Sequence, residues 1–200
     1  MNDTKISKPR GRPRRFDPDE AVATAKHLFH ARGFDALGVA EITAALGINP
    51  PSFYAAFGSK LGLYRRVLDQ YNRTDAIPLP DLLQSDRPIG ESLTAVMEDA
   101  ARRYAANPEA RGCLVIESTR CDDEEARNAA RVFYAAAGQV IRSHIAQKFP
   151  DKADRLADFV CSSMAGLSAM ARNGVSLARL LEIARLAGKA VELELHSANG

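Results

Sequence analysis

Apolar residues recur every three or four positions along most of this chain, which is the spacing of one buried face of an α-helix. The first such region begins with Asp17 as a cap and Pro18 in the first turn, where no backbone N–H is needed. Its periodicity ends before Gly33. No stretch alternates apolar and polar residues as a half-buried strand does, so the pattern predicts an all-α fold.

Two short helices joined by a glycine follow this first helix. The earlier one covers residues 39–46 and stops at Gly47, because glycine adopts the left-handed conformation without the steric cost of a Cβ. The later one has Asn49 as its cap and Pro50 as its first residue, and it ends near residue 58. This arrangement is a helix-turn-helix, which places its second helix in the major groove of DNA.

A further helix is predicted to begin at Ser59, and the Pro-rich break Ile77-Pro78-Leu79-Pro80 follows it. We expect this break to separate domains, which divides the chain into a flexible basic arm (1–15), a helix-turn-helix domain (16–75) and a second helical domain (76–200). Turn-forming residues divide the second domain into predicted helices over about 88–106, 108–120, 123–148, 152–173 and 176–196.

Positive charge is concentrated at the N-terminal end of the chain. The net charge is +2, but residues 1–75 carry 12 Lys and Arg against 8 Asp and Glu, whereas residues 76–200 carry 15 against 17. The arm alone holds six basic residues against Asp3, and it is rich in Pro and Gly. Arginines on a narrow extended chain can enter the minor groove, so we expect the arm to bind DNA, with a solvated tail as the alternative.

Other features of the sequence disfavour the rival classes of function. An apolar run of 18 residues and a secretory leader are both absent, so we expect a cytoplasmic protein without a membrane partner. Cys113, Cys121 and Cys161 match no zinc-binding spacing and are expected to be reduced thiols. Hydrolase, zinc-protease and phosphate-loop motifs are missing, so an enzyme is disfavoured and neither metal nor cofactor is expected. A protein-interaction module that uses this fold without DNA is the second alternative.

The sequence around the helix-turn-helix resembles the DNA-binding domain of the TetR family of bacterial repressors. The resemblance covers about residues 10–70 and rests on Phe16-Asp17, Leu28-Phe29 with Gly33-Phe34, Ile42 with Ala45-Leu46-Gly47-Ile48, and Ser52-Phe53-Tyr54 with Phe57, Ser59-Lys60 and Leu63. It implies a homodimer that binds double-stranded operator DNA and a variable second domain that binds a small-molecule effector. It further implies a repressor that this effector releases from the operator.

Residues on the outer side of the second short helix, at the start of the next helix and in the arm are the expected DNA contacts. Tyr54 lies one position beyond the apolar Phe53 and can point its hydroxyl at a phosphate, unless it only fills the core. Lys60 begins a helix whose amides favour anions, and the resemblance implies that it contacts phosphate. Few side chains here can read bases directly. The expected set is Arg10, Arg12, Arg14, Arg15, Thr43, Pro50, Pro51, Ser52, Tyr54, Ala55 and Lys60.

The last two predicted helices carry the expected dimer surface. Apolar or small residues occupy nearly all sides of the helix over 152–173, so this helix needs more than one packing partner. The resemblance implies that the pair meets its symmetry mate as a four-helix bundle, while intrachain core is the alternative. The expected interface residues are Leu156, Phe159, Val160, Ser163, Gly166, Leu167, Met170, Leu177, Leu180, Leu181 and Ala184.

An effector pocket is expected in the second domain, where a mostly apolar segment around residues 111–120 also carries polar groups. The candidate lining residues, which could equally be ordinary core, are Met97, Tyr104, Cys113, Ile116, Glu117, Phe133 and Tyr134. Cys113 or Cys121 could sense redox state, because nearby Arg111 and Arg120 favour a thiolate. An inert buried cysteine is the alternative.

Deleting residues 1–15 tests the role of the arm. We expect weaker binding to operator DNA and a shallower salt dependence, because up to about five contacts with phosphate or the minor groove are lost, each contributing roughly 0.9 to the slope of log affinity against log salt. Fluorescence anisotropy with labelled DNA at several salt concentrations measures both quantities. An unchanged affinity and slope would show that the arm is a passive leader.

Overall fold

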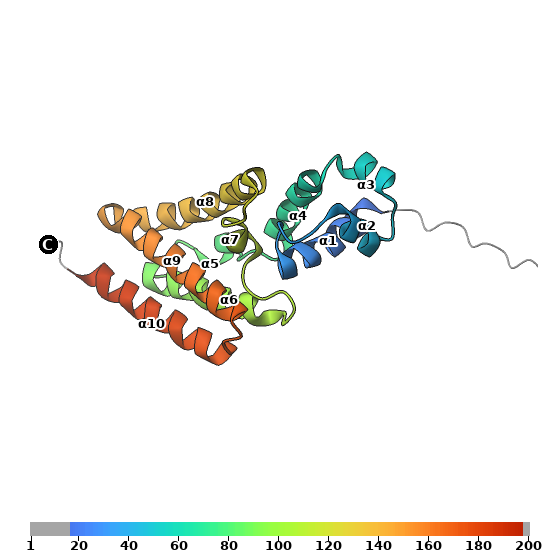
Figure 1. The fold of residues 1–200 in the computed structure, drawn as a ribbon. Helices are drawn as coiled ribbons and strands as arrows, with labels where there is room; N and C mark the ends of the chain where they lie inside the picture. Colours follow the sequence, from blue (N-terminus) through green and yellow to red (C-terminus); the bar gives the residue numbers. More distant parts are fainter. Residues whose placement is uncertain (1–16, 198–200) are drawn as a thin grey trace, which may run out of the picture.

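The computed structural model describes residues 17–197, which form two groups of helices and no strand (Figure 1). The predicted all-α fold is confirmed. Among these residues no helix is both long and apolar enough to cross a membrane. The four arginines predicted to bind DNA from the arm lie outside the described residues. The helices are α1 (Pro18–Arg32), α2 (Val39–Leu46), α3 (Pro50–Phe57), α4 (Lys60–Thr74), α5 (Leu79–Leu82), α6 (Ile89–Ala106), α7 (Leu114–Ser118), α8 (Glu124–Ala146), α9 (Ala153–Arg172) and α10 (Leu177–His196), with a 3-10 turn at Pro150–Lys152.

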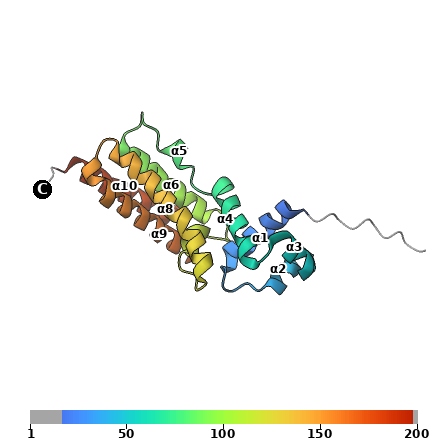
Figure 2. The ribbon, with the colours of Figure 1, turned by 90° about the horizontal axis from the view of Figure 1, so that it is seen from above.

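Helices α1 to α4 form one end of the molecule (Figures 1 and 2). The starts of α3 and α4 are fixed by side-chain caps, since Asn49 accepts a hydrogen bond from the amide of Ser52, and Ser59 accepts one from the amide of Gly62. Gly47 has the left-handed conformation that the turn between α2 and α3 requires, with φ of +65°. The predicted bounds of the two short helices are therefore confirmed.

Helix α6 lies at the centre of the second group, with α9 and α10 packed side by side along it and α8 beyond α9 (Figures 1 and 2). Two glycines bring α6 and α10 unusually close. A Cβ at Gly188 of α10 would lie 2.2 Å from the hydroxyl of Thr94, and one at Gly90 of α6 would lie 2.8 Å from the side chain of Glu192. Side chains larger than hydrogen are excluded at both crossing points, so α6 and α10 form a tightly packed pair.

The helix predicted over residues 108–120 is wrong. The chain instead forms a loop that ends in the short helix α7. Gly112 has φ of +82°, a conformation that favours glycine, and its amide donates to the carbonyl of Tyr104 at 2.9 Å. The apolar run after Gly112 has the composition of a helix but not the length, because this glycine stops any helix that enters from the preceding residues. The Pro-rich break also differs, since it contains the short helix α5.

A buried lysine closes the C-terminal end of α10. Lys152 is only 5% exposed, and its Nζ donates to the carbonyls of Glu194, Leu195 and Ser197 at 2.7, 3.3 and 2.8 Å. The last carbonyls of a helix have no partner within the helix, and a cation is favourable at this end. Lys152 therefore joins the start of α9 to the end of α10.

Replacing this lysine tests its contribution to stability. We expect Lys152→Met to lower the free energy of unfolding by about 2 kcal/mol, because buried carbonyls lose a charged donor. Lys189→Met, on the exposed side of α10, is the matched control and should change stability little. Urea unfolding followed by circular dichroism measures both variants, and equal midpoints would contradict the assigned role.

Candidate nucleic-acid interface and ligand cavity

Helix α3 has one buried side and one exposed side. Phe53 and Phe57 are buried, with ring centroids 5.5 Å apart, and they fix the helix on the small domain. The opposite side carries no charge and is formed by small or rigid residues together with one phenol. The predicted contacts exposed on this side are Pro50, Pro51, Ser52, Tyr54 and Ala55.

Tyr54 and Lys60 are positioned by aromatic neighbours. Tyr54 is 52% exposed, and its ring packs edge-on against Phe53 with a centroid distance of 5.3 Å. The Nζ of Lys60 lies 3.9 Å from the ring centroid of Phe34, a distance at which the cation is attracted to the ring. The Lys60 side chain is thus held over Phe34 at the start of α4.

Arg66 of α4 is a positioning residue that the sequence analysis missed. Its guanidinium donates to the carbonyl of Ala56 at 3.2 Å and lies 5.3 Å from the ring centroid of Phe57. It therefore supplies a partner for the C-terminal end of α3, where carbonyls lack helical partners. Only the crossing of α3 and α4 brings these residues together, so no local sequence signal reveals the contact.

Thr43 does not have the position expected of a DNA contact. Its side chain is nearly buried, with 4% of the residue exposed, and its hydroxyl donates to the carbonyl of Ala40 at 3.0 Å. Bonding to a carbonyl in the preceding turn is common for threonine in helices. Thr43 follows Ile42 in the sequence of α2, and the structure buries both residues.

A cavity of about 450 Å³ lies in the second domain, between α4 and α5 on one side and α6 to α9 on the other. Five of the seven predicted pocket residues line it: Tyr104, Cys113, Ile116, Phe133 and Tyr134. The sequence analysis missed the contribution of α4 and the following segment, from which Tyr71 and Ile77 also line the cavity. Its size is within the range of small-molecule sites.

Met97 and Glu117 do not line this cavity. Met97 is fully buried in the core. Glu117 instead accepts a hydrogen bond from the hydroxyl of Ser168 at 2.9 Å and forms an ion pair with Arg120 at 2.9 Å. Its carboxylate therefore points away from the cavity, toward a smaller hollow between the two groups of helices.

The cysteines are not arranged as arginine-activated thiolates. Burial raises the pKa of Cys113, and burial followed by the carboxylate of Asp35 raises the pKa of Cys121. Burial also raises the pKa of Cys161, which lines the cavity. All three residues are therefore thiols at neutral pH, and the expected effect of Arg111 and Arg120 on Cys113 and Cys121 is wrong.

Three hydrogen bonds join the helix-turn-helix group to the segment over residues 112–118, and we call them the domain junction. The hydroxyl of Tyr71 donates to the sulfur of Cys113 at 3.5 Å, and the hydroxyl of Tyr64 donates to Ser118. Burial lowers the pKa of His30, so its neutral ring donates Nε2–H to the carbonyl of Gly112 at 3.1 Å.

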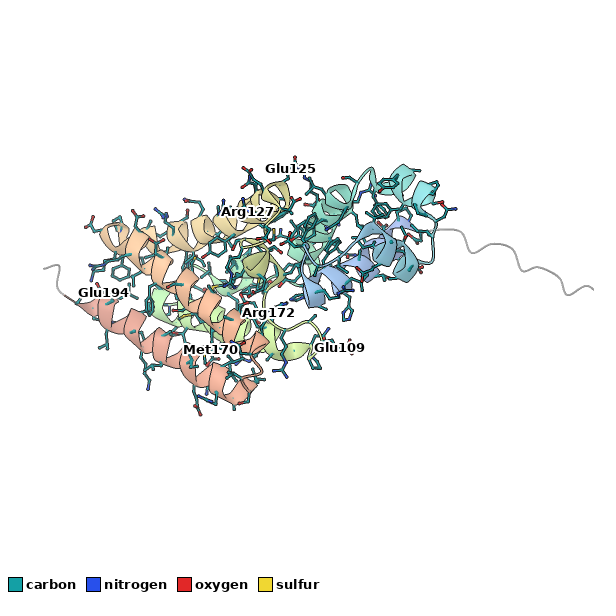
Figure 3. The ribbon with its side chains drawn as sticks, viewed as in Figure 1. Glu109, Glu125, Arg127, Met170, Arg172 and Glu194 are labelled. Carbon is teal, nitrogen blue, oxygen red and sulfur yellow. The ribbon has the colours of Figure 1, made fainter. Side chains whose placement is uncertain are left out.

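Arg172, at the end of α9, supports the junction from outside. It donates to the carbonyl of Arg111 at 2.9 Å and to that of His30 at 3.3 Å (Figure 3). Ser168, one turn earlier, accepts a hydrogen bond from the amide of Cys113 at 2.9 Å. The loop that replaces the predicted helix is therefore held from both sides, by α1 and α4 and by α9.

The predicted dimer residues divide into two groups. Five are buried within one subunit, because they face α6 and its neighbours: Leu156, Val160, Leu167, Leu180 and Ala184. No surface of these side chains remains for a partner. The other six are exposed or partly exposed: Phe159, Ser163, Gly166, Met170, Leu177 and Leu181.

The outer side of α10 carries two large apolar residues that are not among the expected interface residues. Leu186 is 68% exposed and Leu193 is 74% exposed, at a spacing of seven residues. Because α9 and α10 both pack their inner sides on α6, their outer sides share one layer (Figure 1). The expected interface residues Leu180 and Ala184 instead lie on the side of α10 that is buried within the subunit, since the period alone does not say which side faces α6.

Comparison with known proteins agrees with this architecture. Residues 21–67 match the family described as "Bacterial regulatory proteins, tetR family". The chain is 50% identical over 188 residues to the HTH-type transcriptional repressor BdcR of Escherichia coli (strain K12), with 94% of this chain and 95% of that protein covered. It is 30% identical over 190 residues to the HTH-type transcriptional repressor ComR of the same strain, with 90% of each covered.

A solved structure extends the likeness to three dimensions. A cysteine mutant of the TetR family transcriptional regulator CifR, complexed with 26-bp double-strand operator DNA, matches with a TM-score of 0.81 and 30% identity. The match covers 90% of this chain and 99% of that one. The protein belongs to the TetR family. It is a DNA-binding transcriptional regulator and not an enzyme, which confirms the resemblance found in the sequence.

Proposed function

We propose that the protein is a homodimeric repressor in the cytoplasm that leaves its operator when a small molecule enters the cavity. The observation that carries this proposal is the position of Tyr71, which belongs to α4 of the DNA-binding domain and also lines the cavity. Two relatives named as repressors support repression, and not activation, as the effect on transcription. The domains are the arm (1–15), the DNA-binding domain (16–75) and the effector-binding domain (76–200).

Helix α3 is the element that enters the major groove. Its exposed side offers Ser52 as the one hydroxyl near the helix start, with apolar contacts from Pro50, Pro51 and Ala55. Tyr54 and Lys60 contact phosphates on either side of the groove. The arginines of the arm add contacts in the minor groove. Because few side chains read bases directly, DNA shape and the arm contribute much of the preference.

Release of the DNA follows from the domain junction. A molecule in the cavity touches Tyr71 and changes the position of α4, which in turn carries the C-terminal end of α3 through the hydrogen bond from Arg66 to Ala56. In a dimer this alters the spacing of the two α3 helices relative to the two half-sites. A ligand that binds the displaced state more tightly therefore lowers DNA affinity.

The dimer forms through the outer sides of α9 and α10. These helices together expose Phe159, Gly166, Leu186 and Leu193 in one layer, with half-buried Met170 beside them. A two-fold symmetric dimer fits a palindromic operator. The proposal is tested by selecting bound fragments from genomic DNA of the source organism, which should share a two-fold symmetric site bound by two subunits. Selection of unrelated fragments, or binding by single subunits, would contradict it.

Substitutions on α3 and α4 separate phosphate contacts from base contacts. We expect Tyr54→Phe and Lys60→Ala to weaken binding to all DNA sequences about equally, because phosphate contacts carry no sequence information. Ser52→Ala should instead cost roughly 1 kcal/mol or more at one operator position if the hydroxyl reads a base. Anisotropy against a panel of single-base operator variants measures both effects. A changed base preference in Tyr54→Phe or Lys60→Ala, or an unchanged profile in Ser52→Ala, would reject the corresponding assignment.

Gly166→Arg tests the dimer surface. A Cβ at Gly166 meets no atom within 4 Å, so the isolated subunit can accommodate the arginine and should keep its fold. At a close two-fold contact the charged side chain would be desolvated without a partner, so we expect monomers and an operator affinity lower by several orders of magnitude. Sedimentation with circular dichroism measures assembly and fold, and Ala106→Arg, on the exposed end of α6, is the control. A folded Gly166→Arg variant that remains dimeric would place the interface elsewhere.

A further inference from the structure

The charged groups of the ligand cavity are confined to one end. Among the described residues that line it, only Arg73 and Asp75 carry formal charges, and both come from the C-terminal end of α4. Asp75 already has partners, since its carboxylate pairs with Lys26 at 2.5 Å and accepts from the hydroxyl of Thr74. Arg73 is exposed to solvent at the rim. No unpaired charge from these lining residues is therefore available in the interior.

The deep walls consist of apolar groups and neutral hydrogen-bond donors. Tyr104 is 2% exposed, and it lines the cavity together with the thiols of Cys113 and Cys161. Burial raises the pKa of all three groups, so each keeps its proton at neutral pH. A hydroxyl and two thiols can donate hydrogen bonds to an oxygen on a ligand, but they cannot neutralise a charge.

Aromatic side chains face the cavity from two opposing elements. Phe133 and Tyr134 come from α8, while Tyr71 comes from α4. Val140 of α8 lines the cavity and is 44% exposed, so the cavity is open to solvent beside this residue. A flat, apolar molecule therefore meets apolar surface both at the entrance and inside.

We propose that the cavity selects an uncharged, largely apolar molecule with the size of one or two fused rings and one hydrogen-bond-accepting oxygen. This inference rests on the proposed function, in which the cavity is the effector site. An ionised carboxylate or ammonium group would lose its hydration in the interior without meeting a counter-charge, which is strongly unfavourable. An uncharged carbonyl loses less, and it finds Tyr104 as a donor.

The same chemistry explains how such a molecule reaches the domain junction. The hydroxyl of Tyr71 donates to the sulfur of Cys113 at 3.5 Å, and sulfur is a weak acceptor. A ligand oxygen is a better acceptor and competes for this hydroxyl. The ligand then replaces a hydrogen bond of the junction and does not merely fill space beside it.

A pair of probes of equal shape tests the selectivity. The probes are 2-acetylnaphthalene, which is neutral, and 2-naphthoate, which carries a carboxylate at pH 7.5. We expect isothermal titration calorimetry of the full-length protein to show one ketone per subunit and at least tenfold weaker binding of the carboxylate. Naphthalene, which has no acceptor, should bind more weakly than the ketone. Equal or tighter binding of 2-naphthoate, or no binding of the ketone, would overturn the proposal.

Variants show whether the ketone occupies this cavity. Ala137 lines it, so Ala137→Trp should abolish binding, whereas Val132→Trp, on the exposed side of the same helix, should not. Tyr104→Phe keeps the ring but removes one of the donors, so it should reduce the preference for the ketone over naphthalene. Binding that survives Ala137→Trp, or a ketone preference that Tyr104→Phe leaves unchanged, would contradict the assignment.

Operator binding distinguishes this inference from the proposed function. Anisotropy with the selected operator is measured with and without saturating 2-acetylnaphthalene. Loss of DNA affinity on ketone binding supports both statements. Ketone binding with unchanged DNA affinity would remove the effector role from the cavity while leaving its preference for neutral ligands intact. Preference for 2-naphthoate together with DNA release would reject the selectivity for neutral ligands while supporting the effector role of the cavity.

Discussion

The domain junction is the contact on which the rest of the structure depends. It joins the DNA-binding helices to the second domain through the phenols of Tyr64 and Tyr71 and the ring of His30. Burial raises the pKa of both tyrosines and lowers that of His30, so all three groups are neutral. A junction of neutral hydrogen bonds can rearrange without exposing a buried charge.

The DNA-binding domain could be predicted from the sequence because its signals are local. The cap at Asn49, the left-handed Gly47 and the proline that opens α3 each act within a few residues, and the structure has the helix bounds that they predict. The all-α fold follows from periodicity in the same way. Thr43 is the exception, because its burial depends on how α2 packs and not on its neighbours in sequence.

The second domain was less predictable because its features depend on contacts between distant segments. The loop that replaces the predicted helix over 108–120 is held by its contacts with α6 and α9. At Gly112 a Cβ would lie 2.8 Å from the hydroxyl of Ser168 in α9, a contact that the sequence does not reveal. Five cavity residues were recognised by type, but the contribution of α4 requires the packed structure. The packed structure is also needed for α10. Its apolar residues lie on two sides of the helix, and the sequence does not show which side packs against α6.

The two glycines that bring α6 and α10 together determine where the molecule can deform. At Gly188 and Gly90 the backbone of one helix lies directly against side chains of the other, Thr94 and Glu192, and leaves no room for a Cβ. The α6–α10 pair is therefore the closely packed side of the second domain. The compliant side is the one formed by α4 and the short α5, whose ends are loops. Under the proposed function, this difference in stiffness would direct a displacement caused by a cavity ligand toward the DNA-binding helices.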